Sequence, residues 1–349
     1  MMDDVLELKK KFLIKSNDKA HNLRHKGIIN FNIDKYNAAV KNGKAQFDAL
    51  EKARQYAKNI KWAAIEQLDK QLELFEANMI AQGGKVLWAT NAKEAQQMIL
   101  EICAAKNAKL IVKSKSMVTE EIHLNDFLES HNIESVETDL GEYIQQLDGE
   151  PPYHIVTPAM HKSKEDIATL FHKKLGTPPN LNPSELTLVA RDKLRAKYIE
   201  APIGITGANF IVSDIGGICV TENEGNGRLS TALPKTHIVI VGIEKVIPSM
   251  QDLALFWPLL STYGTGQKLT VYNTIFTGPR KQGETDGPEE MYVILLDNGR
   301  TNLLKKEVRE SMYCIRCGSC LNACPVYKNI GGHTYDTTYS GPIGSVITP

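Results

Sequence analysis

Four cysteines near the carboxyl end have the spacing of an iron–sulfur site. Cys314, Cys317, Cys320 and Cys324 form the run C-x2-C-x2-C-x3-C, and Pro325 follows directly. Bacterial ferredoxins hold 4Fe–4S clusters through thiolates at this spacing. Structural zinc sites instead usually pair two separated C-x2-C halves or add histidines, so the run favours iron over zinc. The predicted chemistry is the transfer of one electron at a time.

The same run raises the question of which cysteines complete a cluster. In two-cluster ferredoxins the fourth cysteine binds the other cluster, and a second run downstream supplies the missing ligand. No cysteine follows Cys324 in this sequence. Either the sequence is shortened, or a partner supplies the ligand, or Cys324 bends back, and we favour the first. We therefore expect two clusters in the complete protein and an incomplete or empty cluster site in this chain.

A second group of polar residues follows a predicted strand, and it offers acid–base chemistry. It contains Glu222, Asn223, Glu224, Asn226 and Arg228, interrupted by two glycines. Carboxylates can transfer protons, glycines let the backbone approach a ligand, and arginine can hold a carboxylate by two hydrogen bonds. Polar turns have a similar composition, so residue types alone support a site and a turn equally. Glu222 and Glu224 are the candidate catalytic residues.

Two more loops complete the candidate pocket. Lys113 and Lys115 lie where a predicted strand ends and a helix begins, which is the end of an α/β sheet where ligands bind. These lysines could hold an anion, but solvated lysines at a strand end explain them equally well. Gly207 and Asn209 belong to another loop, which fits neither the dinucleotide-binding pattern nor a P-loop. The candidate binding residues are Lys113, Lys115, Gly207, Asn209, Asn223, Asn226 and Arg228.

The hydrophobic pattern predicts the elements that position these residues. Residues 1–80 alternate apolar and polar positions at helical spacing and predict a helical N-terminal arm. From residue 81 onward, strand-like runs, among them 154–160, alternate with helical ones and predict a mainly parallel sheet flanked by helices. After residue 200 helices are fewer, and we expect mixed or antiparallel strands completing the same sheet. A helix over 302–313 should lead to the cysteines. The histidines at 123, 154, 161 and 237 show no metal-ligand spacing among themselves.

Composition and charge restrict the class of protein further. The 349 residues include 41 Lys+Arg and 41 Asp+Glu, with 42% hydrophobic and 23% charged residues. The balanced charge argues against a nucleic-acid binder, which normally has a basic excess. No apolar run approaches the roughly 20 residues that span a bilayer, and the N-terminus lacks the pattern of a secretory signal. We therefore expect a cytoplasmic globular protein without a transmembrane segment.

Read together, these segments resemble the lactate utilization protein B (LutB) family of iron–sulfur proteins. The resemblance covers nearly the whole chain and includes KSKSM (113–117), ITGANF (205–210), ENEGN (222–226), GIEK (242–245) and the cysteine run. It implies a LUD domain over 81–300, with a fold similar to the NagB/RpiA/CoA-transferase superfamily. The helical arm over 1–80 precedes it, and a linker helix with a partial ferredoxin-type 4Fe–4S region over 301–349 follows.

The resemblance also implies a function. Members of that family act with two companions, a cysteine-rich protein and a second LUD protein, to oxidise L-lactate, a small 2-hydroxy acid, to pyruvate. The expected role is the iron–sulfur electron-transfer subunit of such a complex, not catalytic alone. Family members continue into a second cysteine run that is absent here, and no motif for a hydride acceptor such as flavin is present. Two alternatives stay open: a CoA-transferase-like or isomerase-like enzyme using a glutamate of the 222–224 loop, and a non-catalytic scaffold.

Overall fold

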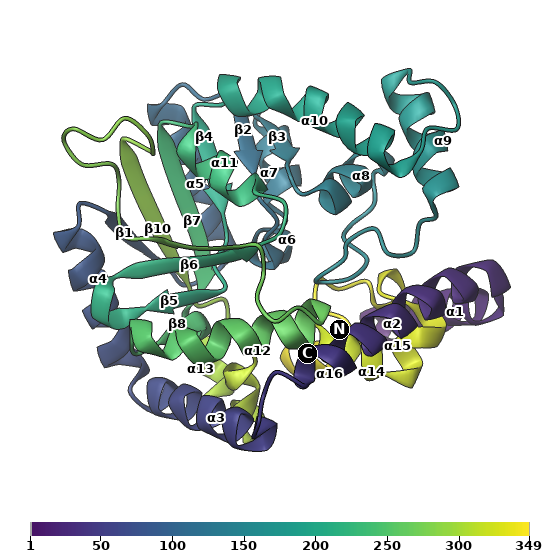
Figure 1. The fold of residues 1–349 in the computed structure, drawn as a ribbon, viewed down its shortest axis with the longest axis horizontal. Helices are drawn as coiled ribbons and strands as arrows, with labels where there is room; N and C mark the ends of the chain where they lie inside the picture. The colour runs from purple at the N-terminus through teal and green to yellow at the C-terminus, as the bar shows by residue number, and fades with distance from the viewer. Residues whose placement is uncertain (1, 349) are drawn as a thin grey trace.

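A parallel six-stranded sheet forms the centre of the protein (Figure 1). The computed structural model describes residues 2–348, and side chains from residue 6 onward. The strand order is β1–β10–β7–β4–β2–β3, and every neighbouring pair is parallel. The α/β class predicted from the sequence is therefore confirmed. The strands are β1 (Lys85–Ala89), β2 (Leu110–Lys113), β3 (Glu134–Glu137), β4 (Ile203–Thr206), β7 (Thr236–Gly242) and β10 (Glu290–Leu296).

A second, four-stranded sheet differs from the prediction of one mixed sheet. Its order is β8–β5–β6–β9, with β6 antiparallel to both of its neighbours and β5 parallel to β8. The antiparallel strands do not extend the first sheet, because β7 and β10 are apolar on both faces and both faces need a cover. The second sheet supplies part of that cover. Its strands are β5 (Phe210–Val212), β6 (Gly217–Glu222), β8 (Val246–Ile247) and β9 (Tyr272–Phe276).

The two faces of the first sheet pack against different layers. On one face, Ile205, Ile240 and Ile294 share a core with α5 (Ala92–Ala105) and the segment of α6 and α7. On the other face, Val239 and Val293 pack with α4 and the second sheet. A further core joins β2 and β3 to three helices. The helices of these layers are α6 (Met117–Glu121), α7 (Leu124–Ser130), α8 (Leu140–Asp148), α9 (Lys164–Leu175) and α10 (Pro183–Glu200).

The N-terminal helices divide between two parts of the molecule. The helices α3 (Leu50–Glu66) and α4 (Leu68–Ala81) pack on the sheets. In contrast, α1 (Met2–His21) and α2 (Leu23–Lys44) lie beside the C-terminal helices, shown in yellow in Figure 1. The two ends of the chain therefore share a core. Among residues 2–348, no helix combines the length and apolarity needed to cross a membrane. The C-terminal helices are α14 (Ser319–Ala323), α15 (Pro325–Ile330) and α16 (Gly341–Ile347).

Two local predictions are wrong. Residues 154–160, predicted as a strand, form a turn in which the His154 ring nitrogen Nδ1 accepts the N–H groups of Val156 and Thr157 at 3.0 and 3.2 Å. The residue that follows, Pro158, has no N–H to give to a sheet. The single helix predicted over 302–313 is divided into α13 and a 3-10 helix. The remaining helices are α11 (Asn226–Ala232), α12 (Leu253–Thr265), α13 (Arg300–Leu303), and the 3-10 helices η1 (Ser213–Ile215), η2 (Ile243–Lys245), η3 (Met250–Asp252), η4 (Glu307–Tyr313) and η5 (His333–Tyr335).

A candidate site between the sheet and the cysteine loop

A cavity of about 400 Å³ lies at the carboxyl ends of β2 and β4. These neighbouring strands mark a switch in topology, because the chain continues from β2 to β3 on one side and from β4 toward β7 on the other. Ligands of open α/β sheets bind at such switch points. The lining comes from the loops after β2, β3, β4 and β6, from α12, and from the cysteine loop. The location alone therefore favours a ligand site.

Most of the predicted site residues meet in this cavity. The lining includes Lys115, Gly207, Asn209, Glu222, Asn223, Glu224 and Asn226, together with Cys317. Two predicted residues are elsewhere. Lys113 is fully buried in a separate charge cluster, and Arg228 is exposed, with its guanidinium 5.3 Å from the centre of the Tyr272 ring. The position of Arg228 does not support its predicted role as an anchor for a ligand in the cavity.

Glu222 holds the start of α11 at the cavity wall. Its Oε2 accepts the backbone N–H of Gly227 at 2.7 Å, and its Oε1 accepts that of Arg228 at 2.9 Å. With its amide nitrogen toward Glu222, the Asn226 side chain donates to Oε2 at 2.7 Å and accepts from the Asp139 N–H at 3.2 Å. Burial raises the pKa of Glu222, and the backbone bonds oppose this rise. A carboxylate engaged at both oxygens acts in positioning and is poorly placed as a nucleophile.

Glu224 is better suited to proton transfer. Its Oε2 accepts the backbone N–H of Leu140 at 3.1 Å, at the beginning of α8. Glu224 reaches solvent, but the surrounding walls partly desolvate its carboxyl group. This desolvation, followed by the negative charge of Asp139, raises the pKa of Glu224 to about 7. A group with a pKa near the ambient pH can both accept and release a proton. The structure therefore separates the two predicted catalytic carboxylates into one that shapes the wall and one that can act as a base.

The other predicted residues shape the remaining walls. Asn209 accepts a backbone N–H of β6 through its side-chain oxygen at 2.8 Å. The amides of Asn223 and Gln267 pair through two hydrogen bonds of 3.0 Å. Lys115 donates from Nζ to the carbonyl oxygen of Val156 at 2.7 Å. These contacts fix the loops around the cavity before any ligand arrives, which reduces the conformational entropy lost on binding.

Two cationic residues of the lining were not predicted. Lys245 is 8% exposed, and burial lowers its pKa to about 8, although Glu244 opposes this effect. Arg316 comes from the cysteine loop, and its guanidinium lies 5.1 Å from the centre of the Tyr339 ring. Both occur in segments that carry the family resemblance, but spacing along the chain does not show that they face one cavity.

A series of ion pairs docks the cysteine loop on the α/β domain. Arg300 contacts Glu121 at 2.8 Å and Glu244 at 2.5 Å, and Glu244 lies 3.5 Å from Arg316. Burial alone would raise the pKa of Glu244, but the two arginines lower it to about 2. Glu244 is therefore ionised, and it links α13 to the loop that carries the cysteines.

Cys317 connects the cysteine loop to the cavity. Burial raises the pKa of Cys317 to about 11, and the nearby thiols of Cys314 and Cys320 contribute to the rise. Cys320 and Cys324 pack against the core shared by the two ends of the chain, whereas Cys317 packs against the core of the second sheet. Because Cys317 also lines the cavity, the cysteine loop borders the candidate site.

The loop fits an iron–sulfur cluster in its backbone as well as its thiols. The left-handed φ angles of Arg316 (59°) and Gly318 (77°) bend the chain around the sulfurs. The N–H of Arg316 donates to Cys314 Sγ at 3.4 Å, and the N–H of Tyr327 donates to Cys324 Sγ at 3.5 Å. Hydrogen bonds to ligand sulfurs tune the potential of such clusters. The donor set is therefore suited to hold iron through thiolates.

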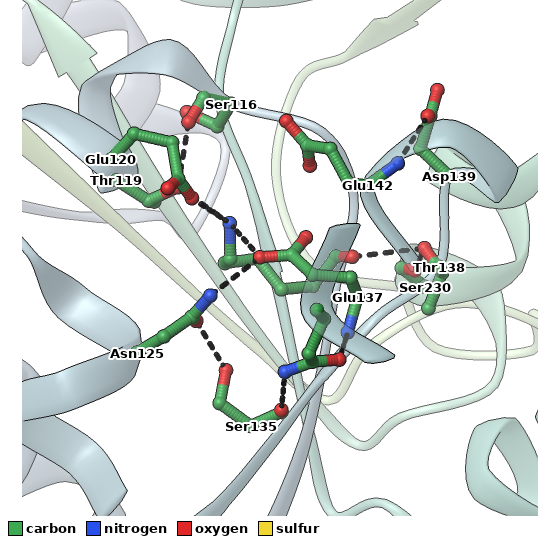
Figure 2. Close-up of polar contacts among 12 residues, drawn as sticks. Ser116, Thr119, Glu120, Asn125, Ser135, Glu137, Thr138, Asp139, Glu142 and Ser230 are labelled. Carbon is green, nitrogen blue, oxygen red and sulfur yellow. Dashed lines mark hydrogen bonds and ion pairs between the residues drawn. The ribbon is translucent and has the colours of Figure 1, made fainter. Parts of the chain in front are cut away.

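Lys113 is the centre of a buried charge cluster next to the loops of the cavity. Its Nζ lies 2.6 Å from Glu137 Oε1 and 3.1 Å from Glu120 Oε1, and it donates to Thr119 Oγ1 at 2.8 Å. Burial opposes the charged form, but the carboxylates outweigh this effect and raise the pKa of Lys113. Figure 2 shows dashed contacts from this amine to Glu120 and Glu137, and the Glu142 carboxylate without a dashed contact. Lys113 therefore neutralises carboxylates, and its position does not support the predicted role in cofactor binding.

Glu142 is the unpaired acid of this cluster. It is 2% exposed, and neither of its side-chain oxygens has a hydrogen-bond partner among the described residues. Burial, and then the charge of Glu137, raise the pKa of Glu142 well above its usual value. This shift favours the protonated form of Glu142, which limits the negative charge around Lys113.

We expect Glu142→Gln to stabilise the protein at pH 8. Because its folded-state pKa is raised, the folded protein binds more protons, so stability falls as pH rises above the unfolded carboxyl pKa of about 4.3. Glutamine has the same shape as a protonated glutamate but cannot lose a proton. The free energy of unfolding at pH 8 should therefore rise by at least about 1 kcal/mol. Urea denaturation at pH 5 and pH 8 measures it. The control is Glu134→Gln, at an exposed pair with Lys197. A parallel pH profile for variant and wild type would contradict the assignment.

Comparison with known proteins agrees with the two parts of the structure. Residues 72–296 match the LUD domain, and residues 310–348 match the 4Fe–4S dicluster domain. The lactate utilization protein B of Bacillus licheniformis is 48% identical over 300 residues, and that of Bacillus subtilis is 47% identical over 300 residues. Each match covers 86% of this chain and 63% of the relative, so the chain spans less than two thirds of their length.

A solved structure of a DUF162 family protein from Deinococcus radiodurans also aligns, over 66% of this chain and 98% of its own, with 14% identity and a TM-score of 0.38. The family assignment depends on the domain matches, which coincide with the features described above. The LUD match contains the whole parallel sheet, and the dicluster match contains all four clustered cysteines. The chain therefore belongs to the LUD domain family, with a 4Fe–4S dicluster domain at its carboxyl end.

Proposed function

We propose that this protein is the iron–sulfur electron-transfer subunit of a complex that oxidises L-lactate to pyruvate, and that its cavity receives the 2-hydroxy acid. The observation that carries the proposal is a single cavity lined by both Glu224 and Cys317. Relatives named lactate utilization protein B support the choice of substrate. The companions in this proposal are a cysteine-rich protein and a second LUD protein.

The lining matches the demands of the reaction. Oxidation of one lactate to pyruvate releases two electrons and two protons. In this proposal Glu224 takes the hydroxyl proton, and the positive charges of Lys115 and Lys245 attract the carboxylate of the substrate. A 4Fe–4S cluster, when bound, accepts and passes on one electron at a time. The second electron and proton therefore require acceptors in the companion proteins, so the subunit is not catalytic alone.

The geometry gives less support to the transferase alternative. Acyl transfer through a carboxylate needs an oxygen free to attack the substrate. Both oxygens of Glu222 already accept backbone N–H bonds, so the transferase alternative would have to use Glu224. Glu222 is therefore a positioning residue in the proposed function, and Glu224 is the base.

We expect Glu224→Gln to lower lactate-dependent cluster reduction in the reassembled complex by about 10²- to 10⁴-fold, the usual contribution of a general base. The wild-type rate should rise through a pH of about 7, where Glu224 loses its proton, and the variant should lack this rise. Visible absorbance of the cluster under anaerobic conditions measures both effects.

Arg228→Gln is the matched control, because Arg228 belongs to the same loop but is exposed outside the cavity. It should retain the rate within about twofold. Reduction of each variant by dithionite verifies that its cluster is intact. Full lactate-dependent reduction in Glu224→Gln would refute a role for the cavity and leave the scaffold interpretation.

A further inference from the structure

A group of potential metal ligands lies away from the cysteines. Glu150, His161 and His333 each present one ligand atom, and these atoms lie within 4.8 Å of one another. Glu150 follows α8, His161 precedes α9, and His333 begins η5. Two histidines and one carboxylate form the ligand set of many zinc and non-haem iron sites, which keep further positions for water. We propose that these three residues bind a divalent transition-metal ion, such as Zn²⁺.

The spacing of the ligands is close to that of a metal site. His161 Nε2 lies 3.1 Å from Glu150 Oε2. Metal bonds of 2.0–2.2 Å in tetrahedral geometry place neighbouring ligand atoms about 3.4 Å apart. His333 Nε2 lies 2.7 Å from the carbonyl oxygen of Pro151, so a metal bond at Nε2 would replace this hydrogen bond. Binding therefore needs only side-chain adjustments.

The two imidazoles are held in place by packing. The Tyr153 ring stacks on His161 with centroids 4.4 Å apart and meets His333 edge-on at 4.9 Å. The two imidazole centroids are 4.9 Å apart, with their planes inclined at 68°. Tyr153 itself is 1% exposed. The site is therefore preorganised, which favours binding because little rotamer entropy remains to be lost.

Lys162 competes with the metal ion for the Glu150 carboxylate, and it has a second acidic partner. Lys162 Nζ lies 2.8 Å from Glu150 Oε2 and also contacts Asp148. When the metal takes the Glu150 oxygen, Lys162 keeps Asp148 as its partner. Because Glu150 and His161 lie within the LUD match whereas His333 lies in the dicluster match, the ion would connect these two parts of the chain.

The test is titration of the cluster-reconstituted full-length chain with Zn²⁺ in a calorimeter. We expect one equivalent bound at nitrogen and oxygen ligands, with a Kd below about 10 µM, and a rise in Tm of roughly 3–6 °C at saturating metal. X-ray absorption at the zinc edge distinguishes this site from the cysteines, because it should show no sulfur neighbours.

Two variants should bind no zinc at this site and show no rise in Tm with Zn²⁺. They are Glu150→Gln and the double variant His161→Ala with His333→Ala. His131→Ala, an exposed histidine at the end of α7, should keep both. Far-UV circular dichroism verifies the fold of each variant. If the double variant misfolds, Glu150→Gln, which preserves the shape of the side chain, still tests the site. Zinc bound only through sulfur, or an equivalent retained in Glu150→Gln and in the double variant, would overturn the proposal.

Discussion

In the complete protein, where we expect two clusters, replacing Cys317 with serine is expected to abolish binding of the cluster that this residue helps to hold, while the α/β domain stays folded. Cys317 is electrostatically coupled to Cys314 and Cys320, and a serine hydroxyl does not replace a thiolate as a ligand for iron. No residue of the cysteine loop belongs to the core that joins the first sheet to α5 and α7, and Cys317 only borders the core of the second sheet. Anaerobic reconstitution should yield a variant with lower iron content and lower visible cluster absorbance than the wild type, and with nearly unchanged helix content by circular dichroism.

Cys103→Ser is the matched control, because Cys103 is fully buried in the apolar core between the first sheet and α5, and no residue of the cysteine run belongs to that core. It should retain the cluster but lose about 1–3 kcal/mol of stability, since it buries a hydroxyl without a partner. A full iron content in Cys317→Ser would contradict the ligand assignment. Wild-type protein that is colourless after anaerobic purification and holds zinc at these cysteines would contradict the iron–sulfur proposal itself.

Replacing Lys113 with methionine is expected to destabilise the protein by about 3–5 kcal/mol, the cost of removing one partner from a buried ion pair. Lys113 is fully buried, and its loss would leave Glu137 and Glu120 without their positive charge. Methionine occupies a similar volume, so the change acts on charge more than on packing. Urea denaturation at pH 7 measures the free energy of unfolding.

Lys85→Met is the control, because Lys85 forms an ion pair with Glu290 at 2.6 Å but its side chain is 52% exposed. Solvent screens such pairs, so the loss should stay below about 1 kcal/mol. Adding Glu137→Gln to Lys113→Met should recover part of the stability, since it removes one stranded charge. Equal losses in the two lysine variants would show that the buried cluster contributes no more than a surface pair.

The Lys113 cluster also has a consequence for the cavity. It joins the ends of β2 and β3 to α6 and α8, and the residues that follow these strands include Lys115 and Asp139 of the cavity lining. Glu224 in turn bonds the first N–H of α8. Loss of the charge cluster around Lys113 should therefore disturb the cavity as well as the fold.

The cysteine site could be predicted from the sequence because its geometry is local. All four sulfurs lie in one short loop, so spacing alone nearly determines which of them can converge. The loops of the cavity could also be predicted, because parallel strands place their carboxyl ends at one edge of a sheet. Lys115 and Asn209 follow β2 and β4 of this sheet and meet there, whereas Glu222 and Glu224 reach the cavity from β6 of the second sheet. The apolar runs of β7 and β10 indicated strands, but their parallel pairing in the first sheet differs from the mixed or antiparallel strands expected after residue 200.

Only the tertiary structure decided which charged side chains face the cavity. Lys113 and Lys115 are two positions apart, yet one is enclosed by glutamates and the other lines the site. Arg316 enters the lining from a remote segment, just as His333 meets His161. The physical reason is that separation along the chain says nothing about distance between different elements. Those distances follow from how the apolar faces of sheets and helices pack, and no single segment contains that information.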